Sequence, residues 1–582
     1  MPQTLLVELA DRIAAAARRA FGDGVALPAA LVLPARDARH GDYSSPVAMS
    51  LAKSLGQAPV AVAERLVAAL QVDDLCDRPE VVAPGFVNLR LRDGWLATRV
   101  SAGGLVVVPD QRHQRVVVDY SGINVARRMH VGHLRSTIIG DGLANVLAAL
   151  GHHVDRLNHL GDWGAQFGKL LAHLEDVRSG SERPSGDLAI ADVEAFYREA
   201  NRRDEEDEAF HDRARRKVVE LQAGEPGARA AWAELVDLTK RSNQEVFELL
   251  AIRDLVDRGE SFYQPFLDEV VADLADRGLL VEDQGAKVVF VDGFTNREGD
   301  PLPLIVQNRH GGYGYAVTDL AALRHRLTAM GADRVVYVVD AGQSQHLAMV
   351  FAVARVAGWV TDDHEVVHVG FGLVLGEDGK RLRTRSGENV RLDELLTEAV
   401  ERSRAFVVAR AEERGEAPPD DLDHVARVIG VGAVKYADLS QNRQSNYVFS
   451  FERMLSLKGN TAPYLQYAYA RIRSILRSDG AAAPTGDGPG AVVLDDPAER
   501  DLAKVLVGTA DVVARVAEDY EPNHLCAHLY DVAQVFSRFY EACPVLKAPE
   551  PIRSSRLVLC RATADVLEAG LALLGIEVLD RL

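Results

Sequence analysis

Two histidines three residues apart, His130 and His133, have the type and spacing that can do chemistry. They stand in the stretch MHVGHLRS (129–136), where a helical pattern begins, and the N–H groups at the start of a helix favour phosphate. Gly132, between them, leaves room for a flat base or ribose against the backbone. Imidazole N–H groups can stabilise phosphate oxygens as charge develops. The alternative is that both histidines only cap a surface helix.

A basic loop bounded by glycines, GKRLRTRSG (379–387), is the second candidate. It supplies Lys380, Arg383, Thr384 and Arg385 after a segment with the pattern of a strand. Open α/β sheets bind ligands at the carboxyl ends of their strands, where mobile cations can fold over a triphosphate. The alternative is a solvated basic loop. The sequence has no Walker A motif and no GxGxxG signature, so neither of those nucleotide-binding motifs is expected.

Alternating strands and helices are expected to position these residues. Residues 116–120 and 154–159 have the pattern of strands on either side of a helix at 133–150, and further strands are expected at 334–339 and 366–375. This order predicts a parallel α/β sheet, with the charged, mostly helical residues 176–300 as an insertion. We expect three domains: an α+β domain at 1–105, the α/β domain at 106–390 and a helical domain at 391–582.

Composition narrows the class of protein. The chain has 582 residues, of which 47% are hydrophobic, as in a globular protein of several domains. Its 66 basic and 85 acidic residues give a net charge of −19, which argues against a general polyanion binder but allows local basic patches. Four scattered cysteines without a CxxC pair argue against disulfides or zinc and fit a reducing cytoplasm. We expect no signal peptide and no membrane-spanning segment.

The two motifs resemble the HIGH and KMSKS signatures of class I aminoacyl-tRNA synthetases, and their flanks resemble the arginyl-tRNA synthetase family. The matching stretches are VVVDYSGINVARRMHVGHLRSTIIGD, NHLGDWGAQFG, GESFYQP, GGYGYAVTDLAALRHR, YVVDAGQSQH, KYADLSQNR and GNTAPYLQYAYARI. This resemblance implies a Rossmann-like, parallel-sheet catalytic domain. It also implies that the N-terminal α+β domain contacts the elbow of tRNA and that the C-terminal all-α domain is a DALR-type anticodon-binding domain.

The same resemblance implies the reaction and its residues. It implies that L-arginine and ATP with Mg²⁺ form arginyl-adenylate, that tRNA(Arg) accepts the arginine, and that activation requires bound tRNA. No protein-bound metal is expected. The resemblance assigns His130, Gly132, His133, Arg127, Lys380, Arg383, Thr384 and Arg385 to ATP or catalysis. It assigns Asp119, Ser121, Asn124, Glu260, Tyr315, Asp319 and Gln343 to arginine, and Phe86 and Asn88 to tRNA.

Several of these residues also allow simpler interpretations. Asp319 and Tyr315 share one helix face, but Asp319 could instead form a salt bridge with Arg324 or Arg326. Phe86 could belong to the core, and so could three tyrosines of the C-terminal region that could otherwise stack on anticodon bases, Tyr464, Tyr467 and Tyr469. Three histidines, His152, His153 and His159, are interpreted as structural or exposed rather than as metal ligands.

The chain departs from the family pattern at four places, one of which, the basic loop, differs at two positions. Ile123 stands where the family usually has proline, and Arg127 and Arg383 stand where it has lysine; Leu382 occupies the position of another signature lysine, and the chain ends in Leu582 rather than methionine. Arginine keeps the charge but changes its shape and reach. These departures leave two alternatives, a divergent paralogue with a non-standard acceptor and an inactive tRNA-binding homologue. We expect a cytoplasmic monomer.

Overall fold

The computed structural model describes residues 3–35, 37–125, 127–180, 193–383, 390–478 and 492–582. The chain divides into two compact units, and each is described by itself. One unit contains residues 1–111, 457–573 and 577–582, and the other contains residues 112–456 and 574–576. Residues 391–456 therefore group with the α/β region, and the two end regions of the chain share a unit. The three functional domains expected from the sequence stay a prediction.

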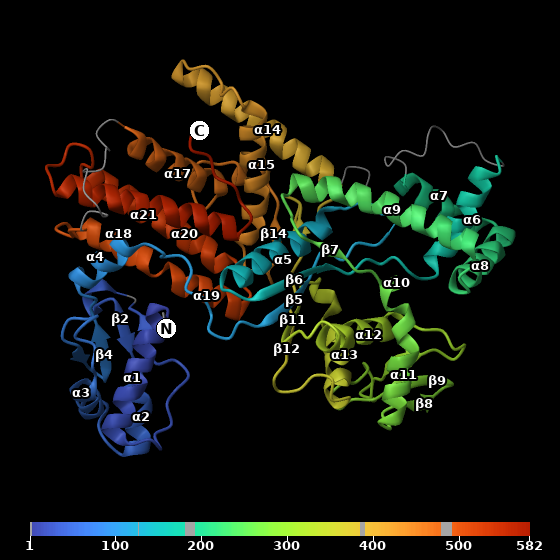
Figure 1. Ribbon diagram of the computed structural model, residues 1–582, viewed down its shortest axis with the longest axis horizontal. Helices are drawn as coiled ribbons and strands as arrows, with labels where there is room; N and C mark the ends of the chain where they lie inside the picture. Colours follow the sequence, from blue (N-terminus) through green and yellow to red (C-terminus); the bar gives the residue numbers. More distant parts are fainter. Residues whose placement is uncertain (1–2, 36, 126, 181–192, 384–389, 479–491) are drawn as a thin grey trace. The chain divides into compact units, whose positions relative to one another are not determined.

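A five-stranded parallel sheet is the centre of the second unit (Figure 1). Its order is β12 (Glu365–His368), β11 (Arg334–Tyr337), β5 (Arg115–Asp119), β6 (His153–Asn158) and β7 (Val256–Asp257). Strand β5 lies in the middle, and its three valines, Val116, Val117 and Val118, are fully buried. Such a continuous apolar run is typical of a strand covered on both faces. The Rossmann-like parallel sheet expected from the sequence is confirmed.

Three helices position the candidate residues on this sheet. Helix α5 (Val131–Ala149) follows β5, α12 (Tyr315–Thr328) precedes β11, and α13 (Ser344–Val356) follows β11. Helices α12 and α13 share a large apolar core with α11 (Leu267–Asp276) and with residues of the sheet. Because these helices are fixed by packing, side chains at their N-terminal ends are held at the edge of the sheet.

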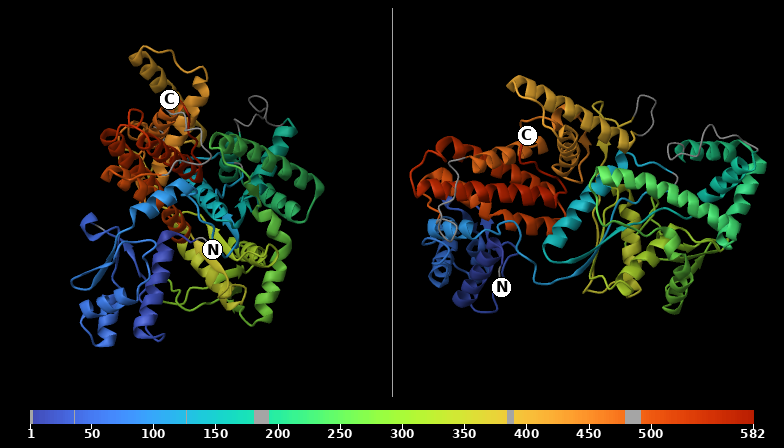
Figure 2. Two further views of the ribbon diagram at one scale, coloured as in Figure 1. Left: turned by 60° about the vertical axis from the view of Figure 1, so that its left-hand side comes forward. Right: turned by 45° about the horizontal axis from the view of Figure 1, so that its top comes forward.

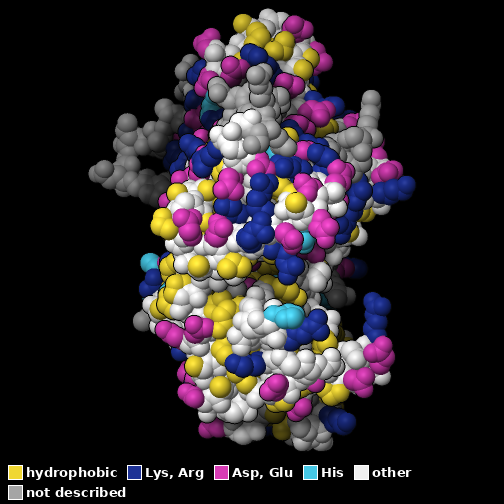
Figure 3. Space-filling model, turned by 90° about the vertical axis from the view of Figure 1, so that its right-hand side faces the viewer, with side chains coloured by type: hydrophobic (Ala, Val, Ile, Leu, Met, Phe, Trp, Pro, Cys, Tyr) yellow, Lys and Arg dark blue, Asp and Glu magenta, His cyan; other side chains and the backbone are white. Residues whose placement is uncertain are grey.

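Four helices form a bundle, and all but the first lie within the range expected as an insertion (Figures 1 and 2). They are α6 (Gln166–Arg178), α7 (Val193–Glu206), α8 (Glu208–Gln222) and α9 (Pro226–Leu249). Figure 3 shows basic and acidic side chains intermixed over the face on this side, and pairs such as Arg203–Asp176 at 2.8 Å join neighbouring helices. The interpretation of residues 176–300 as one insertion is wrong in part, because β7 lies within them and pairs with β6.

Two smaller sheets complete this unit. An antiparallel sheet has the order β10 (Leu304–Gln307), β9 (Ala286–Val289) and β8 (Val281–Asp283). The single strand expected at 366–375 is instead β12 and β13 (Val374–Leu375), and β13 pairs with β14 (Tyr447–Val448). The break occurs at Gly372, where a Cβ would come within 2.7 Å of the Ser445 carbonyl oxygen. Apart from β14, the elements described after residue 391 are helices, as expected. Those of this unit are α14 (Leu392–Arg414), α15 (Leu422–Leu439) and α16 (Phe451–Met454).

The first unit joins a small α+β fold to a set of long helices. Its antiparallel sheet has the order β1 (Leu33–Pro34), β2 (Tyr43–Ser45), β4 (Phe86–Leu89) and β3 (Glu80–Val82). The helices of this α+β part are α1 (Leu5–Phe21), α2 (Val47–Leu55), α3 (Pro59–Ala69) and α4 (Asp93–Ala102). The C-terminal helices are α17 (Ala462–Arg477), α18 (Pro497–Val507), α19 (Thr509–Asp519), α20 (Asn523–Ala542) and α21 (Ile552–Leu573).

A buried charge pair, Arg500 and Asp42, connects these two parts of the first unit, together with the more exposed Asp93. Arg500 of α18 donates to Asp42 at 2.7 Å and to Asp93, the first residue of α4, at 2.7 Å. The Arg500 side chain is 10% exposed and the Asp42 side chain 4%. Removing one member of such a pair would leave a buried charge without its partner.

In the part of the chain described here, no helix is long and apolar enough to cross a membrane.

Candidate active site

A cavity of about 310 Å³ lies at the carboxyl ends of β5, β6 and β11. Asp119 ends β5, His159 follows β6, and the residues after Tyr337 of β11 complete the wall. This is the edge of a parallel sheet at which ligands bind. Eight of the residues expected from the sequence line the cavity, namely Asp119, Ser121, Asn124, Gly132, His133, Glu260, Asp319 and Gln343.

The two histidines form a reciprocal cap at the start of α5. The Gly132 N–H donates to His130 Nδ1 at 3.0 Å, and the His130 N–H donates to His133 Nδ1 at 3.1 Å. A neutral imidazole whose Nδ1 accepts a hydrogen bond carries its proton on Nε2. Burial lowers the pKa of His133 to about 3, so His133 is neutral at physiological pH. The two histidines do cap α5, but this helix is largely buried and is not the surface helix of the simpler alternative. The cap leaves the Nε2–H of His133 as a donor, which is compatible with a role at phosphate.

Gly132 is required by the His130 side chain itself. A Cβ at position 132 would come within 2.7 Å of His130 Cε1 and 2.9 Å of its Nδ1. The two imidazole rings lie 4.0 Å apart with an interplanar angle of 40°. A side chain at position 132 would therefore displace the ring of His130 and disturb the cap, in addition to filling space next to the cavity.

Glu260 reaches the cavity from the short helix α10 (Glu260–Tyr263), which Asp162 holds in place. The Ser261 N–H and hydroxyl donate to the two oxygens of Asp162 at 2.7 and 2.6 Å. Gly259 precedes the helix, and a Cβ there would lie 2.4 Å from the Asp162 carboxylate. The close approach of α10 to this buried aspartate thus accounts for Gly259 and Ser261.

The Glu260 carboxyl group has an unusual acidity. Burial, together with the negative charges of Asp319 and Asp162, raises its pKa to about 8. Two carboxyl groups that face one cavity repel each other unless a cation lies between them. The cavity is therefore suited to a cationic group, and a guanidinium can bond to both carboxylates.

Asp319 projects from α12 and bonds to a histidine of α13. His346 Nε2 lies 2.6 Å from Asp319 Oδ2. The alternative of a salt bridge to Arg324 or Arg326 is wrong, because both arginines have other partners. Arg324 lies 3.6 Å from Glu269 and 3.7 Å from Asp273. Arg326 lies 2.8 Å from Asp119.

The end of β5 presents Asp119 to the cavity, and the loop after it presents Ser121 and Asn124. Asp119 is anchored by the fully buried Arg326, whose pKa is raised by this carboxylate against the effect of burial. Ser121 adopts a positive φ of 77°, and its N–H lies 2.8 Å from the Ser136 hydroxyl. A Cβ at Gly161 would lie 2.0 Å from Asn124 Oδ1, so the chain requires glycine beside this side chain. Ile123, where the family has proline, is fully buried.

Some of the expected residues are not among those that line the cavity. Tyr315 is 67% exposed, and its ring packs edge-on against His346 at 4.7 Å. Arg127 is exposed and lies 5.2 Å from the ring centre of Tyr197 in α7. His130 contributes through its cap, and Lys380 and Arg383 are exposed. Thr384 and Arg385 lie outside the described residues.

Three cavity or supporting residues were missed or misjudged from the sequence. His346 and His159 line the cavity, although His159 was interpreted as structural or exposed. Arg326 forms an ion pair with Asp119. The helical pattern contains both Arg324 and Arg326, and it does not show which of the two is buried. The stretch QSQH was a signal for His346, since it places the histidine three residues after Gln343. Within the described ranges, no group of three or more His, Cys, Asp or Glu side chains could hold a metal ion.

A second cavity, of about 490 Å³, lies in the first unit. Phe86 and Asn88 of β4 line it together with Ser44, whose hydroxyl donates to Asn88 Oδ1 at 2.8 Å. This bond leaves the Asn88 amide to donate its hydrogens. Phe86 is only partly buried, so part of its ring remains accessible for stacking. Tyr469 is buried and bonds to Glu568 at 3.0 Å, which is the core interpretation for that tyrosine.

Comparisons with known proteins give matches over almost the whole chain. The family described as "tRNA synthetases class I (R), catalytic domain" matches residues 99–451. The "Arginyl tRNA synthetase N terminal domain" matches residues 7–91, and the "DALR anticodon binding domain" matches residues 465–582.

Individual relatives match with similar coverage. An arginine–tRNA ligase of Synechococcus elongatus is 51% identical over 583 residues, covering 99% of each chain. One of Thermosynechococcus vestitus is 50% identical over 582 residues, with the same coverage. The arginyl-tRNA synthetase structure of Plasmodium falciparum has a TM-score of 0.87 at 27% identity, covering 100% of this chain and 99% of that one. The structure from Thermus thermophilus has a TM-score of 0.81 at 25% identity, covering 100% of both chains.

Proposed function

Because the chain belongs to the arginyl-tRNA synthetase family of class I tRNA synthetases, we propose that it joins L-arginine to tRNA(Arg) through an arginyl-adenylate. The observation that carries this proposal is one cavity that combines two facing carboxyl groups, Glu260 and Asp319, with the neutral His133 at a helix N-terminus. The two carboxyl groups can bind a guanidinium, and the histidine at the helix N-terminus can bind phosphate.

The first step forms the adenylate. A carboxylate oxygen of arginine attacks the α-phosphorus of ATP, a P–O bond forms, and the bond to pyrophosphate breaks. The chain holds the guanidinium between Glu260 and Asp319, and Asp119, Ser121 and Asn124 hold the α-amino and carboxylate end. His133 donates its Nε2–H to phosphate oxygen as charge develops there. Positioning of this kind requires no side-chain nucleophile.

The second step transfers arginine to tRNA. The 2′-hydroxyl of the terminal adenosine attacks the carbonyl carbon, AMP leaves with the bonding electrons, and the hydroxyl proton is released. Phe86 stacks on a base at the tRNA elbow, and Asn88 donates to it. Mg²⁺ accompanies ATP as part of the substrate. The C-terminal helices bind the anticodon, and the enzyme works as a cytoplasmic monomer.

Aminoacylation of total tRNA with a panel of labelled amino acids tests this proposal. Arginine alone should be attached, and lysine and citrulline should be rejected, lysine by geometry and citrulline by lack of charge. The products should be sequenced to identify the tRNA. Labelling of a different acceptor would favour the divergent paralogue, and no labelling by a folded protein would favour the inactive homologue.

A further inference from the structure

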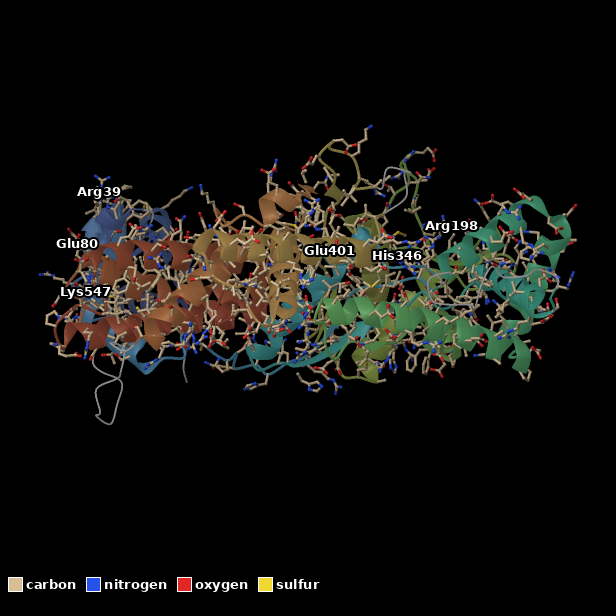
Figure 4. All side chains as sticks on the ribbon, turned by 90° about the horizontal axis from the view of Figure 1, so that it is seen from above. Arg39, Glu80, Arg198, His346, Glu401 and Lys547 are labelled. Carbon is tan, nitrogen blue, oxygen red and sulfur yellow. The ribbon has the colours of Figure 1, made fainter. Side chains whose placement is uncertain are left out.

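His346 lies at the cavity but has no role among the residues proposed to bind arginine or ATP. It lies on α13, lines the cavity and contacts two residues of α12 that stand one helical turn apart. Its Nε2 bonds to Asp319 Oδ2 at 2.6 Å, and its ring packs against Tyr315 with 4.7 Å between ring centres. The His346 side chain is 14% exposed and that of Asp319 23%, so the pair is largely shielded from water. Figure 4 labels His346 among the side chains of the second unit.

The bond to His346 uses only one of the two oxygens of Asp319. Among the described residues, Oδ1 has no hydrogen-bond partner. A carboxylate that is anchored through Oδ2 has a restricted plane, whereas an unanchored one rotates about two side-chain torsions. Because a planar guanidinium needs acceptors close to its own plane, an anchored carboxylate binds it at a lower entropic cost.

The surroundings of His346 strengthen this interpretation. Tyr315 restricts the imidazole ring from the side, although Tyr315 itself does not line the cavity. Asp319 has no arginine or lysine partner within 4.0 Å in the described part of the chain, so His346 is its fixed partner. The Asp319 carboxylate therefore already has a fixed orientation when a cationic substrate binds.

We propose that His346 is a positioning residue for arginine selection, which fixes the Asp319 carboxylate through Nε2 and is itself held by Tyr315. This inference rests on the proposed function, because it assumes that Asp319 binds the guanidinium. His346 does not touch the reacting atoms, so its effect falls on arginine binding. ATP binding and the chemical step are unaffected by its loss.

Two substitutions of nearly equal size separate the hydrogen bond from the volume of the side chain. His346→Gln keeps an N–H donor near the position of Nε2, whereas His346→Met fills similar space without one. His346→Met should raise the KM for arginine by about 10- to 100-fold, the factor expected for a hydrogen bond to a charged group, with KM for ATP and kcat nearly unchanged. His346→Gln should restore the KM to within about threefold of the native value. His364→Met, outside the cavity, is the matched control.

The outcome is interpreted together with Asp319→Asn, measured in the same aminoacylation assay. If Asp319→Asn leaves the KM for arginine unchanged, the proposed role of Asp319 fails, and this inference fails with it. If Asp319→Asn impairs arginine binding but His346→Met and His346→Gln behave alike, only the positioning role is overturned. The double variant Asp319→Asn/His346→Met should be no worse than Asp319→Asn, because the two residues act through one interaction. If His346→Met does not fold, His346→Ala replaces it, with unfolding followed by circular dichroism.

Discussion

The raised pKa of Glu260 predicts that arginine binding depends steeply on pH. Burial, together with the charges of Asp319 and Asp162, places this pKa at about 8, so most of the free enzyme carries Glu260 as a neutral acid at pH 7. A neutral acid cannot form a charge-assisted pair with the guanidinium. Arginine therefore binds the minority of molecules in which Glu260 is ionised, and its binding releases a proton.

The size of the pH effect on the Kd for arginine follows from the fraction of Glu260 that is ionised. With a pKa of about 8, roughly 1% of Glu260 is ionised at pH 6 and roughly 9% at pH 7. The apparent Kd equals the intrinsic Kd divided by the competent fraction, so it should fall about tenfold between these pH values and level off above about pH 8. At pH 7 about 0.9 proton should be released for each arginine bound.

Isothermal titration calorimetry provides both quantities. Arginine is titrated into the free enzyme between pH 6 and 8 in buffers with different ionisation enthalpies, which reports the number of protons released. Glu260→Gln, which cannot ionise, should bind arginine more weakly and lose the slope. A Kd that stays constant from pH 6 to 8, without proton release, would refute the reasoning. A slope that persists in Glu260→Gln would assign it to another group.

The same shift affects stability in the absence of arginine. The pKa of Glu260 is higher in the folded protein than in the unfolded chain, so the folded state loses stability as pH rises from about 4.5 towards 8. Glu260→Gln should therefore raise the melting temperature more at pH 8.5 than at pH 5.5. An equal effect at both pH values in differential scanning calorimetry would contradict burial of a titrating carboxyl group.

Three further predictions concern the other parts of the site. His133→Ala should lower kcat about 10²- to 10³-fold with little change in the KM for ATP, because its donor acts mainly in the transition state; loss of ATP affinity alone in steady-state kinetics would contradict this role. Phe86→Ala should raise the KM for tRNA by about 5- to 150-fold, as expected for loss of one stacked base, while the KM for arginine stays unchanged; an unchanged KM for tRNA would return Phe86 to a packing role. Arginine-dependent exchange of pyrophosphate into ATP should require cognate tRNA, and equal rates with and without tRNA would exclude the expected dependence.

Features with a local cause could be predicted from the sequence. The helix at the HIGH-like motif, the valine-rich strand before it and the shared face of Tyr315 and Asp319 all follow from periodicity and from glycine positions. Residues at the carboxyl ends of parallel strands converge in space, so the meeting of Asp119 and His133 in one cavity also follows from topology. The reciprocal use of Nδ1 by the two histidines was less predictable, since it depends on the rotamer of each ring.

Features that depend on pairing between distant segments could not be predicted in the same way. The two-residue strand β7 is too short to show a pattern, and it is recognisable only from its pairing with β6. The partners of Asp319 and Asp119 come from other elements, His346 from α13 and Arg326 from α12. From helical spacing, Asp319 was a possible partner of Arg326. The actual partner, Asp119, is determined by the packing of α12 against the sheet.

The two halves of the cavity differ in how completely they are built, and this difference bears on the expected tRNA dependence. On the arginine side, Glu260, Asp319 and Asp119 are each held by a neighbouring element, through Asp162, His346 and Arg326. On the phosphate side, the two arginines that stand in place of signature lysines do not line the cavity: Arg127 bonds to the Tyr197 hydroxyl at 3.2 Å, and Arg383 is exposed. An arginine pocket formed in advance can select its substrate without tRNA. The proposed reaction assigns both arginines to ATP, so both would have to leave these positions, and binding of tRNA is the event in that reaction that can supply the free energy for the change.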